Sequence, residues 1–411
     1  MSVTASPRAG GASRLRRADA DRVVLTPRRR PGYIGRIHII QLLVVELAVF
    51  GAVAAFASDA LAGTGAALVA VGVVGITLAR WRGRWLLERR VMTSRYRGRR
   101  RLVRAAGPPT AALSVLRRLA PDLTVENVPI QGGVQVGVAR DDSGWFAAAA
   151  ISPGVMTGES GRVPLDLLAT SIADADQAGA VVQVVVQTVP APATPDKPNW
   201  AEQSYRELLT AVGSEPLLAD RVTWVVIRID ARGLAEAIGD HNADVSSAPA
   251  VVASLLRRLV TSLRQAGVSP RMLDADSLIT VLLRSCDPEP NPSGPVAVRE
   301  RWSVWQSSQM AHRTYWIRNW PAVRQASAMF DALFAVQTVT TTVSLVLDPD
   351  PRTGLVDLTG LVRVSAPPGD LDRSCKAMVR AARKAKADLF PVDGEQAPAT
   401  YASAPTGGGA R

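Results

Sequence analysis

The sequence predicts an N-terminal hairpin of two transmembrane helices followed by a soluble α/β or α+β domain with a mixed sheet. Two apolar stretches, residues 37–57 and 61–79, each have roughly the twenty residues that cross a bilayer as a helix. Arginines flank both stretches. Beyond residue 110, runs with strand periodicity alternate with runs of helical periodicity, which is typical of a domain that combines both elements.

Positive charge is concentrated in the first quarter of the chain. Residues 1–104 contain 20 Arg, no Lys and 5 acidic residues, whereas the rest carries 28 basic and 31 acidic side chains. A cationic surface suits nucleic acid, but these arginines border apolar stretches. That placement fits anionic membrane lipids instead. We therefore expect anionic membrane lipids, and no nucleic acid, among the partners.

The arginines also predict an orientation. Only residues 58–60 separate the two apolar stretches, and Asp59 lies in that turn. The positive-inside rule then places the N-terminus and the soluble domain on the cytoplasmic side of a plasma (inner) membrane crossed twice. Tyr33, Trp81 and Trp85 are expected as aromatic anchors at the membrane interface. The alternative, a signal peptide cleaved after residues 55–57, is disfavoured because a second apolar stretch follows at once.

Polar residues in the first apolar stretch predict a contact with a partner. His38, Gln41 and Glu46 fall on one face of a helix, because offsets of three and eight residues return to the same side. An ionised carboxylate within a membrane is costly. The hypothesis is an intramembrane seam that contacts another protein; the alternative is a protonated Glu46 that faces the neighbouring helix.

Composition divides the rest of the chain. Residues 1–36 are expected to be a disordered arginine-rich tail, and residues 80–110 a basic amphipathic linker that ends at Gly107-Pro108-Pro109. The soluble domain should span residues 111–390, with a subdivision into two related halves near residue 288. Residues 391–411, rich in Pro, Ala and Gly, are expected to be a disordered tail.

Strands and helices can be placed along the soluble domain. Residues 134–139 and 145–151 flank Asp141-Asp142-Ser143-Gly144, which predicts a β-hairpin. Further strands are expected at 180–189, 221–230, 298–306, 311–320, 341–347 and 354–364. Helices are expected at 164–173, 200–212, 251–265, 275–286, 323–334 and 371–389.

Motifs for catalysis are missing from the sequence. There is no Gly-Lys pair for a phosphate-binding loop, and the two cysteines, Cys286 and Cys375, form no CxxC motif. His241 lies among acidic residues, in a segment that is most simply a solvated loop. We therefore expect no catalytic, cofactor-binding or metal site, and no enzymatic activity.

Aromatic residues gather between positions 302 and 320. Trp302, Trp305, Tyr315, Trp316 and Trp320 alternate with arginines. This composition is typical of protein–protein anchors. It equally fits a hairpin whose aromatic side chains pack into the core.

Four segments then carry a family resemblance, at residues 204–209 (SYRELL), 221–230 (RVTWVVIRID), 299–305 (RERWSVW) and 314–321 (TYWIRNWP). In this order, behind a two-helix hairpin, they resemble EccE, a membrane component of the actinobacterial type VII (ESX) secretion machinery. The resemblance covers roughly residues 37–390. The arginine-rich leader is longer than is usual in the family.

The resemblance implies a structural subunit of an inner-membrane translocon. It would form a hetero-oligomer with EccB, EccC (the ATPase) and EccD, and would have no catalytic residues. The alternative is a membrane-tethered enzyme or regulator of envelope or lipid metabolism, acting at the cytosolic face. That alternative predicts a deep pocket lined by paired carboxylates or by a Ser/His pair.

Overall fold

The computed structural model describes residues 25–27, 33–34, 37–58, 60–81, 84–105, 113, 116–152, 163–175, 177, 179–190, 204, 207, 218–231, 247–286, 298–307, 310–350 and 355–409. The chain forms two compact units. Residues 28–107 make a helical unit, and residues 1–27 with 108–411 make a sheet unit. Most of the predicted N-terminal tail and nearly all of the predicted helix at 200–212 lie outside the described residues.

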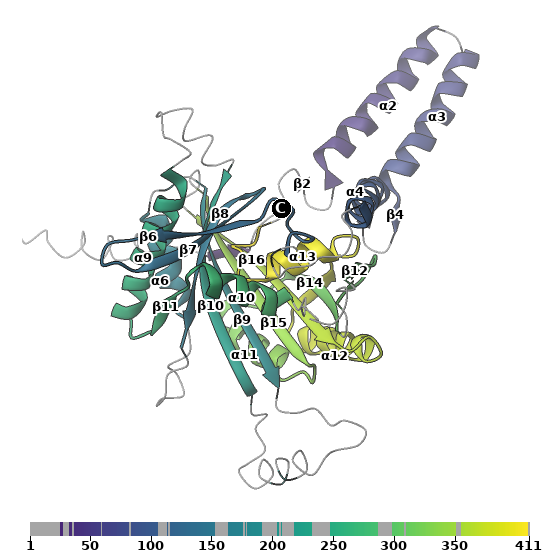
Figure 1. Cartoon of the computed structure of the whole chain (residues 1–411). Coiled ribbons are helices and arrows are strands. Elements are labelled where there is room, and N and C mark those ends of the chain that lie inside the picture. The colour runs from purple at the N-terminus through teal and green to yellow at the C-terminus, as the bar shows by residue number, and fades with distance from the viewer. Residues whose placement is uncertain are drawn as a thin grey trace, which may run out of the picture. The chain divides into compact units, whose positions relative to one another are not determined.

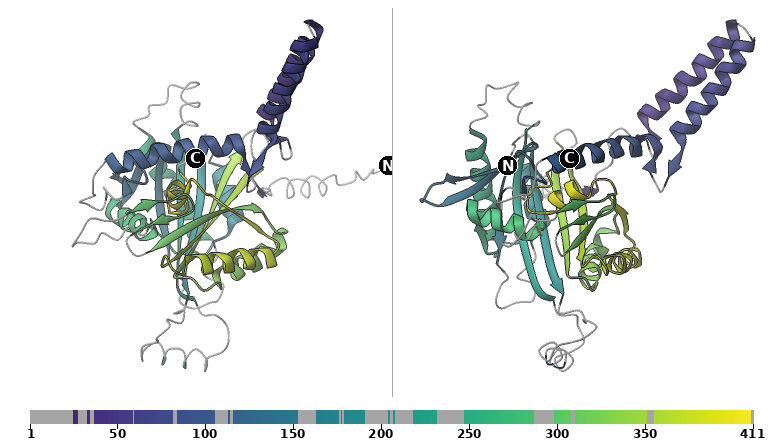
Figure 2. Two further views of the ribbon diagram at one scale, coloured as in Figure 1. Left: turned by 90° about the vertical axis from the view of Figure 1, so that its right-hand side faces the viewer. Right: turned by 45° about the vertical axis from the view of Figure 1, so that its right-hand side comes forward.

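The helical unit is a hairpin followed by a third helix. Helices α2 (Ile39–Ser58) and α3 (Ala60–Leu78) pack side by side (Figures 1 and 2). They approach closely at the turn, where a Cβ atom on Gly63 would lie 2.4 Å from Cδ1 of Phe56. Two short strand pairs, β2 (Tyr33–Ile34) with β3 (Ile37–His38) and β4 (Arg80–Trp81) with β5 (Arg84–Trp85), precede and follow the hairpin, and α4 (Leu86–Ala105) comes last.

The transmembrane prediction for this hairpin is contradicted. Across the residues that the structure describes, no helix combines the length and the apolar character that crossing a membrane requires. This finding corrects both the predicted fold class, with its transmembrane anchor, and the predicted multi-pass localisation in the plasma membrane.

The sheet unit is an α/β domain built on one 13-stranded sheet, whose main path runs β12-β13-β14-β16-β15-β9-β10-β8-β7-β6. The first half supplies β6 (Thr124–Pro129), β7 (Gln135–Asp141), β8 (Gly144–Ile151), β9 (Ala180–Pro190), β10 (Leu218–Asp230) and β11 (Pro270–Met272). The second half supplies β12 (Arg299–Glu300), β13 (Trp305–Gln306), β14 (Ala311–Asn319), β15 (Thr340–Asp350), β16 (Leu355–Ala366) and β17 (Asp388–Pro391). The sheet is antiparallel where a mixed sheet was expected. Among the described strands, only β1 (Leu25–Pro27) pairs in parallel, with β16.

The two halves repeat one arrangement. Among the described elements, the order β7-β8-α6-β9-β10-α9-β11-α10 recurs as β13-β14-α11-β15-β16-α12-β17-α13. β11 pairs with β8 as β17 pairs with β14. The halves meet where β9 and β15 pair antiparallel, with Val184 opposite Leu345. An approximate two-fold axis therefore passes through the centre of the sheet.

Helices cover both faces of the sheet. One face carries α6 (Leu165–Ala173), α9 (Ala248–Gln265), α11 (Val323–Phe334) and α12 (Leu371–Lys384), and the other carries α10 (Ala275–Cys286) and α13 (Gln396–Ser403). The sequence of α9 explains why this helix packs on the sheet. Its buried residues recur at three- and four-residue spacing and form one apolar stripe: Val252, Leu256, Leu259 and Leu263. Figure 1 shows α6 and α9 together beside the first half of the sheet.

The C-terminal segment is ordered, in contrast to the predicted disordered tail at residues 391–411. α12 ends at Lys384, and Lys386 adopts a positive φ of 61°, so the chain turns into β17 instead of continuing the helix to residue 389. The following residues, through α13 to Gly409, are largely buried. Their small Ala, Gly, Ser and Thr side chains allow the backbone to lie directly on the sheet, which explains a composition that resembles disorder.

Candidate functional site

The α2–α3 hairpin exposes many apolar side chains. Leu47 and Phe50 of α2 are 70% and 72% exposed, and Leu61 and Leu68 of α3 are 84% and 71% exposed. Further exposed apolar residues of the hairpin are Leu42, Leu43, Val49, Val53, Phe56, Val69, Val71, Val73 and Ile76. A helix that is apolar all round is normally buried against other apolar groups, and contiguous exposed apolar patches mark interaction sites. The hairpin is thus the strongest candidate interaction surface of the described residues.

Two of the three polar residues predicted to form a seam have described side chains, and these lie in different surroundings. Gln41 is buried, and its Nε2 donates a 3.0 Å hydrogen bond to the carbonyl oxygen of Thr77, so it joins α2 to α3. Glu46 is exposed. His38 lies in β3, opposite Tyr33 of β2, and its side chain is outside the described residues. Gln41 therefore joins the two helices of the hairpin, whereas Glu46 lies on its exposed surface.

The predicted aromatic anchors lie in the short strands that flank the hairpin. Tyr33 is in β2 and Trp81 in β4, with side chains outside the described residues. Trp85, in β5, is only 9% exposed and lies opposite Arg80. Its burial within the protein leaves it little surface for an outside contact.

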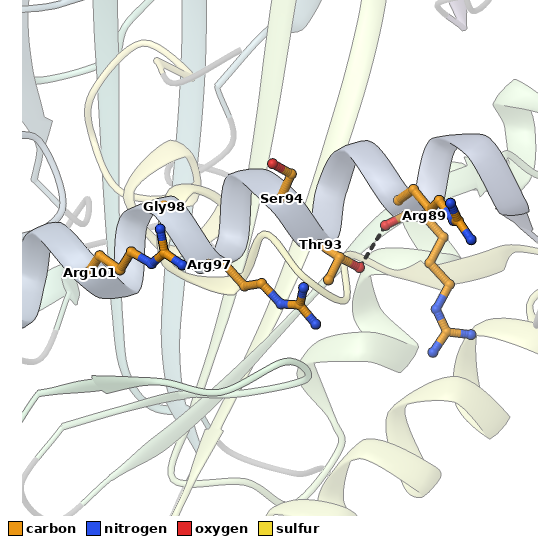
Figure 3. Close-up of a pocket in the computed structure, with 7 residues that line it drawn as sticks. Arg89, Thr93, Ser94, Arg97, Gly98 and Arg101 are labelled. Atoms are coloured by element: carbon orange, nitrogen blue, oxygen red, sulfur yellow. Dashed lines mark hydrogen bonds between the residues drawn. The ribbon is translucent and has the colours of Figure 1, made fainter.

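α4 carries a dense row of arginines. Its 20 residues include eight Arg and one acidic residue, Glu88. A hollow of about 890 Å³ runs along the helix, lined by Arg89, Arg90, Thr93, Ser94, Arg97, Gly98 and Arg101 (Figure 3). Arg89, Thr93, Arg97 and Arg101 follow at four-residue intervals on one side of the helix, and the Thr93 hydroxyl donates to the carbonyl oxygen of Arg89 at 2.7 Å. The surface is electrostatically complementary to an acidic partner.

The predicted interface aromatics divide into two groups. Trp305 and Tyr315 are 3% and 4% exposed and belong to the core. Trp302, Trp316 and Trp320 are half-buried. Trp320 packs edge-on against Phe330, with ring centroids 6.3 Å apart, and Trp302 closes over Gly394. Packing within the domain therefore explains most of this cluster, and only the half-buried members keep surface for a partner.

A buried ion pair lies on the sheet face that α10 and α13 cover. Arg228 of β10 is 3% exposed and donates to both carboxylate oxygens of Asp141, with Nη1 3.1 Å from Oδ2. Its Nη1 also donates to the carbonyl oxygen of Thr406 at 2.8 Å. The Tyr401 hydroxyl donates to the same carboxylate at 3.0 Å. Burial, followed by the charge of Asp141, raises the pKa of Tyr401 well above its ordinary value, so this hydroxyl stays a donor.

Gln183 connects this ion pair to the second half of the sheet. Its Nε2 donates to Ser344 Oγ at 2.7 Å and to the carbonyl oxygen of Ala402 at 2.8 Å. Its Oε1 accepts from the backbone N–H groups of Thr406 and Gly407 at 3.1 and 2.7 Å. All four hydrogen-bonding positions of the amide are thus used. The C-terminal segment is held at the junction of the two halves.

A Ser/His pair lies in the second half of the same layer. His312 Nδ1 and Ser365 Oγ are 2.7 Å apart, and both side chains are buried. They line a cavity of about 110 Å³. That volume is well below the ~300–1,000 Å³ of typical ligand pockets, so the deep pocket that the enzyme alternative requires is not found here. Among the described residues, no group of three or more His, Cys, Asp or Glu side chains could hold a metal ion.

Sequence reasoning missed this buried polar layer, although a signal was present. Arg228 and Arg363 each interrupt an otherwise apolar strand, in Val-Val-Ile-Arg-Ile and in Leu-Val-Arg-Val. A lone arginine in a buried strand must be hydrogen-bonded or paired. The partners that the C-terminal segment supplies could not be found, because that segment was expected to be disordered.

Comparison with known proteins supports the predicted resemblance. Residues 217–317 match the model of a family described as "Putative type VII ESX secretion system translocon, EccE". The match begins at β10, includes α9 and α10, and ends within β14, so it crosses from the first half into the second. No curated protein matches the chain. The expected likeness to EccE is confirmed over these residues and supports a component of a type VII secretion translocon, which implies partners in a complex.

Proposed function

We propose that this protein is a structural subunit of the type VII (ESX) secretion translocon and attaches to EccB, EccC and EccD through its α2–α3 hairpin. The observation that carries the proposal is the apolar surface of the hairpin. A structural subunit must stay bound to the other subunits of the translocon during transport. Burial of each large apolar side chain against a partner contributes about 1.5–3 kcal/mol to such binding. Several such side chains on two helices are enough for a lasting contact.

The arginines of α4 supply a second contact in this proposal. An acidic surface of a partner subunit would pair with Arg90, Arg97 and Arg101, all of which are exposed. Such charge pairs speed association and select the partner more than they increase affinity. The apolar hairpin would therefore determine how tightly the subunit is held, and α4 would determine which partner it meets and in which orientation.

Co-purification from native cells tests the hairpin. The tagged full chain is cross-linked before lysis, purified, and the amount of EccC recovered with it is measured by mass spectrometry. We expect EccC to be recovered with the unaltered chain, and the double substitution Leu47→Ser and Phe50→Ser to reduce that recovery at least tenfold. Val323→Ser is the matched control, because Val323 is 90% exposed but lies on α11 of the sheet unit.

Two results would refute the proposal. One is recovery of the unaltered chain as a lone monomer. The other is equal recovery of EccC with the hairpin variant and with the control. For α4, the purification is repeated without cross-linking, and Arg97→Glu should weaken the recovery of EccC more at low salt than at high salt, because salt screens exposed charges. Arg324→Glu, an exposed arginine of α11, is the control.

A further inference from the structure

The cavity beside Arg363 is lined mainly by polar groups, which come from both halves of the sheet unit. Its volume is about 110 Å³. At about 30 Å³ per water molecule, this is room for roughly three to four waters, or for one tetrahedral oxyanion of five heavy atoms. The residues that matter for the argument are Gln187 of β9, Ser285 of α10, His312 of β14, Thr342 of β15, and Arg363 and Ser365 of β16.

The lining offers hydrogen-bond donors and positive charge. Arg363 is 1% exposed, and its Nη2 reaches Ser285 Oγ at 3.1 Å and Thr342 Oγ1 at 3.3 Å. Arg284, which is exposed, also lines the cavity. No Asp or Glu is among the described residues of the lining. A buried guanidinium beside hydroxyl groups is a favourable setting for an anion, because hydrogen bonds to charged groups are the strong ones.

The first half of the sheet shows what such an arginine binds. Arg228 lies opposite Val181 of β9 and Phe146 of β8, and Arg363 lies opposite Thr342 of β15 and Thr314 of β14. The two arginines therefore occupy corresponding positions about the two-fold axis, on the same face of the sheet. Arg228 holds the carboxylate of Asp141. Next to Arg363 the chain leaves a cavity.

Gln187 indicates that the ligand carries a hydrogen-bond donor. Its Oε1 is buried and has no hydrogen-bond partner among the described residues. A buried acceptor without a donor destabilises the protein unless a ligand or water supplies the missing hydrogen bond. A ligand that carries an O–H group as well as negative charge would satisfy Gln187 and Arg363 together.

We propose that this cavity binds a small protonated oxyanion of the hydrogen-phosphate class. The anion would contact β9 of the first half, β16 of the second half and α10. It would take the place that Asp141 and the C-terminal segment occupy next to Arg228. This site is independent of the interaction surfaces of the helical unit. It gives the sheet unit a ligand that would strengthen the junction of its two halves.

Calorimetric titration of the purified full chain in phosphate-free buffer tests the proposal, with inorganic phosphate as the probe and sulfate at matched ionic strength as the comparison. We expect saturable binding of about one phosphate per chain, and weaker binding of sulfate, which has no O–H at neutral pH to donate to Gln187. Absence of saturable phosphate binding would overturn the proposal. Equal binding of the two anions would overturn the assignment of a protonated ligand.

Two variants locate the site. Gln187→Glu places a negative charge in the cavity, and because like charges repel, we expect phosphate binding to weaken about tenfold or more. Gln265→Glu, at the exposed end of α9, is the matched control and should bind as the unaltered chain does. Should Gln187→Glu fail to fold, Arg284→Gln removes a charge from an exposed side chain and should weaken binding severalfold. Unchanged binding in the folded variants would show that the anion binds elsewhere.

Discussion

Gln183 and Ser344 form a 2.7 Å hydrogen bond across the central strand pair of the sheet, close to the axis that relates its two halves. The same glutamine binds the carbonyl oxygen of Ala402 and the N–H groups of Thr406 and Gly407. One buried side chain therefore joins the first half, the second half and the C-terminal segment. Buried polar groups that are fully satisfied specify a unique arrangement, and they are costly when one partner is removed.

Replacement of this glutamine should destabilise the whole sheet unit. Gln183→Leu leaves the N–H group of Gly407 and the carbonyl oxygen of Ala402 buried without their partner, whereas the N–H group of Thr406 keeps its hydrogen bond to the carbonyl oxygen of Ala404. At about 1–3 kcal/mol for each unsatisfied group, we expect the free energy of unfolding to fall by at least ~2 kcal/mol, measured by chemical denaturation. Gln265→Leu, on an exposed position of α9, should change it by less than ~0.5 kcal/mol. Equal effects would show that the junction does not depend on Gln183.

Two glycines with similar positive φ angles allow the cost of backbone strain to be measured separately from the cost of overpacking. Gly407 has φ +74° and Gly267 has φ +80°, but a Cβ at Gly407 would lie 2.4 Å from Arg228 Cβ, whereas a Cβ at Gly267 would meet nothing within 4 Å. Gly267→Ala should cost about 1–2 kcal/mol from the left-handed backbone alone. Gly407→Ala should cost a further ~1–3 kcal/mol from the overpacked site. Thermal unfolding of the two variants measures the difference, and equal melting temperatures would contradict the close contact between the C-terminal segment and Arg228.

Strands and helices of the sheet unit were predictable where burial follows a simple period. The Val-rich run of β9, the turn at Asp141–Gly144 and the apolar stripe of α9 all follow local rules, and the structure contains each of them. The pairing of β9 with β15 joins residues about 160 positions apart, and no local pattern encodes such a pairing. The two-fold arrangement was therefore visible only as a loose repetition of element order.

The C-terminal segment shows why composition misleads. Ala, Gly, Pro and Thr at residues 396–409 resemble a flexible tail, because they offer little apolar surface. In the structure Tyr401 is 1% exposed and Thr406 is fully buried, since the backbone itself supplies the contacts to Arg228 and Gln183. Backbone hydrogen bonds to distant side chains leave no trace in the sequence of the segment. For the aromatic cluster at 302–320, the sequence left two interpretations open, because core packing and partner binding favour the same residues.

Alkaline pH should weaken the domain through Cys375. Burial raises the pKa of the Cys375 thiol above its ordinary value. In the unfolded chain the thiol ionises near pH ~8.5, while in the folded protein it stays protonated. Above pH ~8.5 the unfolded state therefore binds fewer protons than the folded state. The contribution of this thiol to the free energy of unfolding is constant below pH ~8.5 and falls as the pH rises above it.

Cys375→Ala removes this contribution. We expect the free energy of unfolding, measured in reducing buffer between pH 7 and 10, to decline in the unaltered chain with a slope approaching 1.4 kcal/mol per pH unit. The slope should be shallower in the variant. Above pH ~10 the buried Tyr315 and Tyr401, whose pKa values burial also raises, add to the decline in both proteins. Identical slopes below pH 10 would show that Cys375 is not protected from ionisation.

The turn of the α2–α3 hairpin depends on a glycine that cannot be replaced. A Cβ on Gly63 would lie 2.4 Å from Cδ1 and 2.7 Å from Cα of Phe56, so Gly63→Ala forces the two helices apart at their closest approach. At Gly65, two residues further along α3, a Cβ meets nothing within 4 Å, and alanine there should stabilise the helix by up to ~1 kcal/mol. Hydrogen–deuterium exchange of the full chain should show faster exchange near the turn of α2 and α3 in Gly63→Ala and slower exchange in Gly65→Ala. Because the Gln41–Thr77 hydrogen bond lies at the other end of the hairpin, exchange there should change little in either variant. Faster exchange over the whole hairpin in Gly63→Ala would contradict this expectation. It would show that the packing of α2 against α3 along their full length depends on the turn.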